Sequence, residues 1–200
     1  MLYSSTKSKI RAATLVTATL LTSPVFAHSG HHQAVDIVSG FMHPLLGIDH
    51  LLAMLAVGIW AAQYRQPARW MLLLLFPTVM ALGAVAGMMA VHLPGIEPGI
   101  AGSVAVLGLL IAFAIKMPAA ASGIVVALFA LIHGYAHGVE LPAGASPVLY
   151  GAGFILATLT LHAIGLVIGM AAAGKVANKA MRLLGGAIAA SGAYLLVSAG

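Results

Sequence analysis

The chain of 200 residues is too apolar to face water, because 62% of its residues are hydrophobic and only 6% are charged. Soluble domains carry roughly 25% charged residues, so the composition excludes a soluble globular protein and predicts a membrane protein. The net charge of +5 does not indicate nucleic-acid binding, because the basic residues stand singly between apolar runs, and the absence of cysteine excludes disulfides and thiolate sites.

The first segment is typical of a secretory signal peptide. Basic residues near the N-terminus precede an apolar stretch that ends at about residue 21 and is too short to span a bilayer comfortably. A proline and the small-residue site Val25-Phe26-Ala27 follow, which predicts cleavage after Ala27. The sequence therefore predicts a signal peptide over residues 1–27. Residues 28–200 are expected to form a single membrane domain whose N-terminus lies outside the cytoplasm.

Further apolar segments follow, each near the roughly 20 residues that a helix needs to cross the hydrocarbon core. They cover approximately residues 36–62, 70–91, 99–116, 119–139, 147–173 and 180–198. Short breaks with proline, glycine or basic residues separate them, and the last break runs from Lys175 to Arg182. Glycines four residues apart, as in Gly134 and Gly138, predict close helix packing. We therefore expect an all-α, polytopic protein with a bundle of six transmembrane helices.

The basic residues indicate the orientation of these helices. With the mature N-terminus outside, the loops after the first, third and fifth spans face the cytoplasm, and they contain every basic residue of the mature chain: Arg65, Arg69, Lys116, Lys175, Lys179 and Arg182. Such residues concentrate on the cytoplasmic side of membrane proteins. The outer side carries Asp36, Glu97 and Glu140, so a cation arriving from outside meets negative charge first. The pattern predicts a multi-pass protein of the cytoplasmic membrane.

The first span contains the motif His43-Pro44-Leu45-Leu46-Gly47-Ile48-Asp49-His50. An ionisable group inside a span costs about 2.5–3.5 kcal/mol on insertion scales and therefore indicates function. His43 and His50 lie on nearly the same face of a regular helix, and Asp49 could bind a metal directly or orient an imidazole. Pro44 removes a backbone hydrogen bond, which leaves two alternatives: a helix that opens locally at a metal site, or a helix that begins at Pro44.

The fourth span ends in a second motif, in which His133, His137 and Glu140 follow the spacing i, i+4 and i+7 along one helix face. Two imidazoles and a carboxylate suit a borderline divalent cation. Hydrogen bonding between helices is the structural alternative for the same residues. Both motifs lie in the outer half of the membrane in the predicted topology, so we expect them to converge on one metal site.

Other histidines and acids are weaker candidates. Residues that could capture metal outside the membrane stand at the start of the mature chain and beside the second outer loop: His28, His31, His32, His92 and Glu97. His162 lies in the middle of the fifth span, where a metal ligand and a hydrogen bond to a neighbouring helix are equally compatible with the sequence. Ten methionines raise the alternative of copper, although methionine is also an ordinary component of apolar packing.

The two motifs resemble those of the HupE/UreJ family, and the resemblance extends over the whole chain, from the signal segment through the six spans. Proteins of that family are regarded as secondary nickel or cobalt permeases of bacteria and are associated with hydrogenase and urease gene clusters. The resemblance implies that His43, Asp49 and His50 are central to transport and that His137 and Glu140 support them.

The sequence thus predicts a permease for uptake of a divalent transition metal, Ni²⁺ or Co²⁺, across the inner membrane, with no tightly bound cofactor and no enzymatic activity. It has no nucleotide-binding loop of the Gly-x-x-x-x-Gly-Lys type. The alternatives are a metal-binding accessory protein or sensor, a copper-handling protein, an intramembrane metal hydrolase, and a haem protein ligated by His50 and His162. The metal ion and the lipid bilayer are the expected partners, and a homo-oligomer and a link to hydrogenase or urease maturation stay open.

Overall fold

The computed structural model describes residues 29–89, 93–172 and 174–198, with side chains from Val35 onwards. The chain divides into two units, Met1–His31 and His32–Gly200. Of the first unit only the start of a helix at Ser29 is described, so the predicted signal peptide lies outside the described residues. The second unit carries the candidate site.

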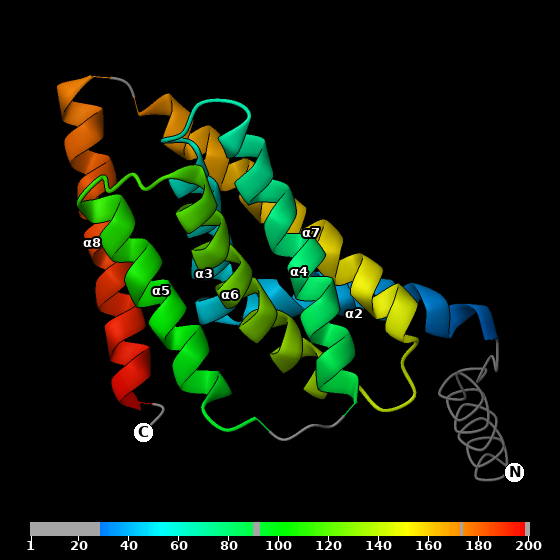
Figure 1. The fold of residues 1–200 in the computed structure, drawn as a ribbon. Helices are drawn as coiled ribbons and strands as arrows, with labels where there is room; N and C mark the ends of the chain where they lie inside the picture. The colour runs from blue at the N-terminus through cyan, green and yellow to red at the C-terminus, as the bar shows by residue number, and fades with distance from the viewer. Residues whose placement is uncertain (1–28, 90–92, 173, 199–200) are drawn as a thin grey trace, which may run out of the picture. The chain divides into compact units, whose positions relative to one another are not determined.

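The described residues contain seven helices and no strand, which confirms the predicted all-α class. The helices are α2 (Ser29–Leu46), α3 (Ile48–Ala61), α4 (Ala68–Met88), α5 (Ile96–Ala112), α6 (Ala119–Val139), α7 (Pro147–Ala171) and α8 (Lys175–Ser198) (Figure 1). The predicted spans from the second to the fifth agree with α4 to α7 within four residues at each end. Strongly apolar runs predict these elements well, because a helix satisfies its own backbone polar groups in lipid.

Four helices, α4, α6, α7 and α8, are long and apolar enough to cross a membrane. The number rises to five if Val35–Leu46 and α3, which are bent by 83° at their junction, together form one broken span. Helix α5 is shorter, with 17 residues, at the lower limit for a spanning helix. The structure therefore supports a multi-pass membrane protein with four or five candidate spans, and the total of six stays a prediction.

The first predicted span is not a regular helix, so the expectation that His43 and His50 share one helix face is wrong. Helix α2 continues through Pro44 to Leu46, and α3 begins at Ile48 after Gly47, whose backbone is extended. The alternative of a helix that begins at Pro44 is therefore also wrong. Pro44 lacks a backbone donor, which weakens the last turn of α2, and glycine is a poor helix former, so the helix opens at Gly47.

The predicted break from Lys175 to Arg182 is also wrong, because these residues form the first turns of α8. Only residues 172–174 separate α7 from α8. Lysine and arginine are good helix formers, so a run that interrupts an apolar pattern need not interrupt a helix. The Nε atom of Arg182 donates a hydrogen bond of 2.8 Å to the carbonyl oxygen of Ala112, the last residue of α5.

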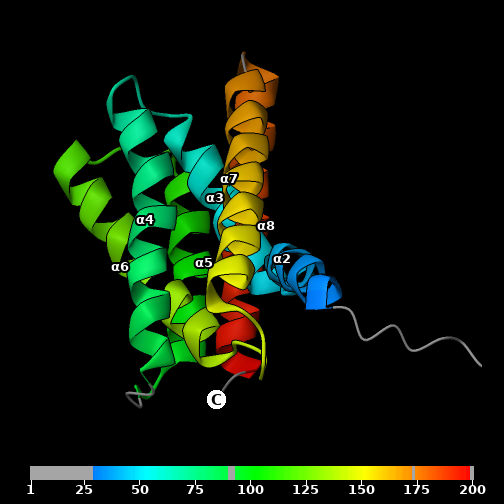
Figure 2. The same cartoon turned by 90° about the vertical axis from the view of Figure 1, so that its right-hand side faces the viewer.

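Close packing joins α4 to α6, α5 to α8 and α3 to α7, and Figure 2 shows α4 and α6 side by side. A methyl group on Gly134 of α6 would collide with the carbonyl oxygen of Met80 in α4, and one on Gly58 of α3 would collide with that of His162 in α7. The predicted packing at Gly134 is thus confirmed. This close packing places His133, next to Gly134, and His162, which contacts Gly58, in the interior of the unit.

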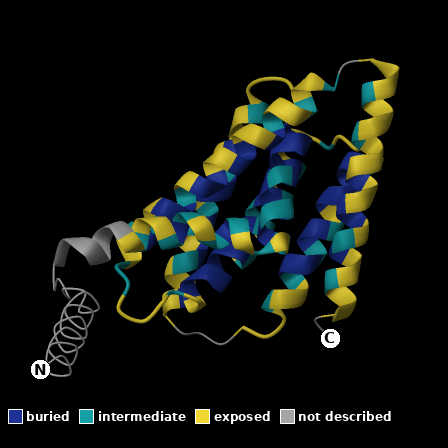
Figure 3. Cartoon of the chain, turned by 180° about the vertical axis from the view of Figure 1, so that it is seen from behind, coloured by how far each residue is buried: buried dark blue, intermediate teal, exposed yellow. Residues whose placement is uncertain are grey.

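Helix α3 is the central helix of the unit, and nine of its 14 residues are buried. Burial is concentrated on the inward faces of the surrounding helices, as Figure 3 shows, while many large apolar side chains point outward, such as Leu74, Ile124 and Val167. A soluble protein rarely exposes so much apolar surface. This distribution is the one expected for helices surrounded by lipid.

Charged residues separate to the two ends of the unit. Helices α4, α6 and α8 begin at the upper end in Figure 1, close in sequence to Arg69, Lys116 and Lys175. Helices α5 and α7 begin at the lower end. Glu97 lies in the first turn of α5, and Glu140 follows the last residue of α6. The candidate metal ligands at the end of α6 therefore lie opposite the basic end.

Candidate metal centre

Three side chains that could hold a metal ion meet where the last turn of α2 approaches the end of α6. The Nε2 atom of His43 lies 3.0 Å from Oε2 of Glu140, and Nδ1 of His137 lies 3.6 Å from the same oxygen. One ligand atom from each residue lies within 4.8 Å of the other two. Metal–nitrogen bonds of about 2.0–2.1 Å allow ligands of one ion to be at most about 4.2 Å apart, so a small contraction would complete the site.

The carboxylate of Glu140 faces these two imidazoles at the surface of the unit. Its side chain is 40% exposed, whereas that of His137 is only 3% exposed. The His137 and His43 imidazoles beside it lower the pKa of the Glu140 carboxyl group below its usual range. Glu140 is therefore an anion at neutral pH and attracts a cation to this position.

Asp49 and His50 form a second pair at the start of α3. The Oδ1 atom of Asp49 lies 2.7 Å from Nδ1 of His50. Because a carboxylate oxygen only accepts hydrogen bonds, Nδ1 carries the proton and Nε2 keeps its lone pair. That Nε2 atom is buried and has no hydrogen-bond partner among the residues that the structure describes. Of the two roles left open for Asp49, the geometry favours orientation of a ligating imidazole.

The bend at Gly47 brings the imidazoles of both motifs into one cluster. The ring centroids of His50 and His137 are 4.4 Å apart, and those of His43 and His137 are 4.9 Å apart. His133 lies one turn deeper on α6, where its ring is 5.2 Å from that of His50. Of the second motif, His137 and Glu140 lie beside His43. His133 lies beside His50, which also contacts His137. A ligand role for all three residues stays a prediction.

A cavity of about 280 Å³ opens beside this cluster. It is lined by His43, Leu46, Gly47, Asp49, His50, Glu97 and Glu140. Three carboxyl groups and two imidazoles thus surround one opening, and Glu97 of α5 joins the residues of the two motifs. The predicted role of Glu97 in metal capture stays a prediction, but the residue lies where a cation would approach.

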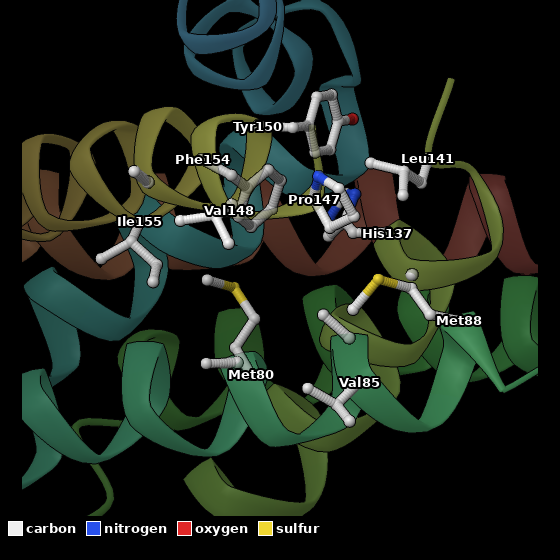
Figure 4. A pocket seen from close by; sticks show the side chains of 15 residues that line it. Met80, Val85, Met88, His137, Leu141, Pro147, Val148, Tyr150, Phe154 and Ile155 are labelled. Atoms are coloured by element: carbon white, nitrogen blue, oxygen red, sulfur yellow. The ribbon is translucent and has the colours of Figure 1, made fainter. Parts of the chain in front are cut away.

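An apolar pocket of about 360 Å³ lies between α4 and α7 on another side of His137 (Figure 4). Sequence reasoning missed two aromatic residues of α7 at this place: Phe154, whose ring centroid is 3.9 Å from that of His137, and Tyr150, which is 5.9 Å from His43. Their spacing of one helical turn was the available signal. The pocket is largely apolar, so the cavity beside Glu97 is the polar approach to the site.

Several residues singled out from the sequence lie away from this cluster or outside the described residues. His28 and His92 are outside the described residues, as are the side chains of His31 and His32. Asp36 accepts a hydrogen bond of 2.8 Å from the backbone of Ser146, so it holds the loop between α6 and α7. His162 is buried on α7, and its Nδ1 atom lies 3.2 Å from the carbonyl oxygen of Leu73.

The comparison with known proteins agrees with the two motifs. Residues 16–195 match the family described as HupE / UreJ protein. The chain belongs to the HupE/UreJ family. It is 43% identical over 187 residues to Protein HupE of Rhizobium leguminosarum bv. viciae, and this similarity covers 94% of the chain and 97% of that protein. No solved structure matches the chain significantly.

Membership of the HupE/UreJ family confirms the predicted resemblance and places the chain among transport-associated membrane proteins linked to nickel handling for hydrogenase and urease. Proteins of this family are transport or accessory proteins and not enzymes. The intramembrane hydrolase considered from the sequence is therefore excluded. The ligand roles of the individual HupE/UreJ residues stay predictions.

Proposed function

We propose that this HupE/UreJ protein is a secondary permease that takes up a divalent transition metal, Ni²⁺ or Co²⁺, through the site between α2, α3 and α6. One observation carries the proposal: His43, His137 and Glu140, which come from two distant segments, offer ligand atoms within 4.8 Å of one another. The oriented imidazole of His50 lies against His137 and adds a fourth ligand.

The proposed topology has a cleaved signal peptide over residues 1–27 and a single domain of six spans, with the mature N-terminus outside the inner membrane. The bent pair of α2 and α3 would be the first span and α5 the third. The separation of charge supports this orientation, because the basic residues lie opposite the end that carries Glu97 and Glu140. The metal site then faces the outside, where a cation arrives.

Uptake begins in this mechanism with a hydrated cation at the cavity between Glu97, Asp49 and Glu140. The cation displaces the proton of the His43–Glu140 hydrogen bond, which is released to the outside water, and exchanges part of its own hydration water for imidazole nitrogen. The membrane potential then draws the ion inward, contributing about 2.3 kcal/mol per charge per 100 mV, or about twice that for a divalent ion. The chain itself needs no ATP for this step.

The ligand set supports a borderline metal ion, because imidazole suits nickel, copper, zinc and iron and carboxylate suits harder ions. Nitrogen and oxygen sites bind Cu²⁺ more tightly than Ni²⁺ whatever their biological cargo. Affinity alone therefore does not identify the metal, and transport has to be measured. The family's link to hydrogenase and urease supports nickel as the first candidate.

The deciding experiment measures uptake of Ni²⁺, Co²⁺, Cu²⁺ and Zn²⁺ into proteoliposomes that contain the purified protein and an inside-negative potential. We expect saturable nickel or cobalt uptake that His137→Ala abolishes. Thr160→Val is the matched control, because Thr160 is exposed on α7 and its hydroxyl donates a hydrogen bond to its own helix, at the carbonyl oxygen of Leu156. Tight metal binding without uptake would refute the permease and favour a metal-binding accessory protein or sensor.

A further inference from the structure

Two histidines lie deeper in the unit than the site described above. His133 on α6 and His162 on α7 are 0% and 1% exposed. The Nδ1 atom of His133 lies 2.8 Å from the carbonyl oxygen of Phe129, and that of His162 lies 3.2 Å from the carbonyl oxygen of Leu73. A carbonyl oxygen only accepts, so each Nδ1 carries a proton and each Nε2 atom keeps its lone pair.

Both of these Nε2 atoms are buried and unpartnered within the described part of the chain. Leaving the Nε2 acceptor buried without a partner costs free energy. A side chain that served only to donate to the backbone carbonyl would not need this second nitrogen atom. His50 has the same arrangement, with Nδ1 on an acceptor and Nε2 unpartnered. The same protonation pattern therefore recurs on α3, α6 and α7, and it leaves three lone pairs that could bind a cation.

A continuous series of ring contacts leads from the outer cluster to His162. The ring centroid of His133 is 5.2 Å from that of His50 and 5.6 Å from that of Phe76 on α4. Phe76 in turn is 5.2 Å from His162. Phe76 is fully buried and contacts both deep histidines edge to face. It is therefore the apolar side chain that connects His133 with His162 in this series.

Soft donor atoms lie near the same level of the unit. The hydroxyl group of Thr158, one turn before His162 on α7, lies 3.4 Å from Sδ of Met54 and 3.8 Å from Sδ of Met80. Both methionines are buried. Thioether sulfur and imidazole nitrogen together favour late transition metals over Mg²⁺ or Ca²⁺. The interior thus contains ligand atoms that can bind a partly dehydrated transition-metal ion but that bind hard cations poorly.

We propose that His133 and His162 form an inner metal-binding station of two successive positions, with Phe76 as the barrier between them. This proposal rests on the proposed function, because it assumes that a cation leaves the outer site. The cation passes from His50 to Nε2 of His133 and, when the Phe76 ring turns aside, to Nε2 of His162. The expected ligand is a late divalent transition metal ion that has lost part of its water shell.

Substitution by asparagine separates this role from a purely structural one. The amide nitrogen of asparagine, like Nδ1 of histidine, is bonded to Cγ, so His162→Asn keeps a donor for the carbonyl oxygen of Leu73 and removes Nε2. His162→Leu removes both. A histidine that serves only to bind the carbonyl would be replaced by asparagine but not by leucine. Thr160→Val, two residues earlier on the exposed side of α7, is the control.

The experiment measures nickel uptake by the full chain in proteoliposomes and nickel binding in detergent for the same preparations. We expect His162→Asn to lower the uptake rate at least tenfold while the affinity of the outer site changes less than twofold. Wild-type uptake by His162→Asn, or a loss in His162→Leu that asparagine restores, would overturn the inner station. If wild-type protein binds nickel but does not transport it, the proposed function itself fails, which is a different result.

A second variant keeps the test decisive if His162→Asn does not insert. Phe76→Leu keeps an apolar side chain but removes the ring that contacts both histidines. We expect it to raise the downhill uptake rate several-fold and to admit Zn²⁺ more readily, at unchanged outer affinity. An uptake rate that stays at the wild-type value, or falls, would remove Phe76 as the barrier and the inner route with it.

Discussion

Replacing His50 and His137 by alanine, singly and together, tests whether the two motifs bind one metal ion. Their ring centroids are 4.4 Å apart although they belong to α3 and α6. Neither motif alone supplies the four to six ligands of a complete coordination shell. We therefore expect each single variant to weaken nickel binding strongly, and the double variant to lose less than the sum of the two losses.

The expected size of the effect follows from the number of bonds involved. Loss of a ligating imidazole should reduce the affinity by at least the 100-fold that loss of an outer-shell partner can cost, which is about 2.8 kcal/mol at 1.4 kcal/mol per tenfold change. Two independent losses would give about 5.6 kcal/mol for the double variant by simple addition. In one shared shell the first loss already replaces protein by water, so a coupling of about 1–3 kcal/mol should reduce that total.

Isothermal calorimetry in detergent measures the four affinities, and the melting temperature of each variant checks that the helices still pack. Thr160→Val again serves as the control, since its side chain is exposed on α7. Additive losses within about 0.3 kcal/mol, the usual precision for independent sites, would mean two separate stations. In that case the shared site between α2, α3 and α6 would have to be abandoned.

Three further predictions concern orientation, topology and packing. Asp49→Asn should lower nickel affinity about 10–100-fold without changing the amount of folded protein, and an unchanged affinity would show that the carboxylate does not orient His50. The chain has no cysteine, so single cysteines can be labelled selectively. Arg65→Cys and Ala143→Cys should react with impermeant thiol reagents from opposite sides of the membrane. Labelling of both from one side would contradict the six-span topology. Gly134→Ala should destabilise the protein by about 1–3 kcal/mol, because the methyl group meets the backbone of Met80, whereas Gly102→Ala meets nothing and should not lower the melting temperature.

The sequence predicts helices α4, α6 and α7 well because lipid leaves the backbone few alternatives. Every backbone polar group inside the bilayer has to be satisfied within its own segment, so a long apolar run is a helix whatever its neighbours are. The same constraint explains why the spacing of His133, His137 and Glu140 predicted one helix face. Spacing along one helix does not say which neighbour each side chain meets, and here His133 meets His50 instead of His43.

The first motif was harder to predict because its geometry depends on a bend. Seven residues of a straight helix rise about 10.5 Å along the axis, yet the ring centroids of His43 and His50 are 6.2 Å apart. The bend of 83° at Gly47 accounts for the difference. Proline and glycine indicate that a helix can open, but the angle depends on packing against α6 and α7, which no local pattern encodes.

Gly47 itself gives the last prediction, because its missing side chain faces the Asp49–His50 pair. A Cβ atom at this position would lie 2.9 Å from Oδ1 of Asp49 and 3.1 Å from Nδ1 of His50. Those atoms end flexible side chains, so Gly47→Ala should fold normally but displace the carboxylate that fixes the imidazole. We expect nickel affinity to fall about tenfold, the lower end for loss of an orienting contact, with the melting temperature near that of the wild type. If Gly47→Ala instead loses stability and affinity together, the bend holds the helices in place and does not specifically keep space for the metal-binding pair.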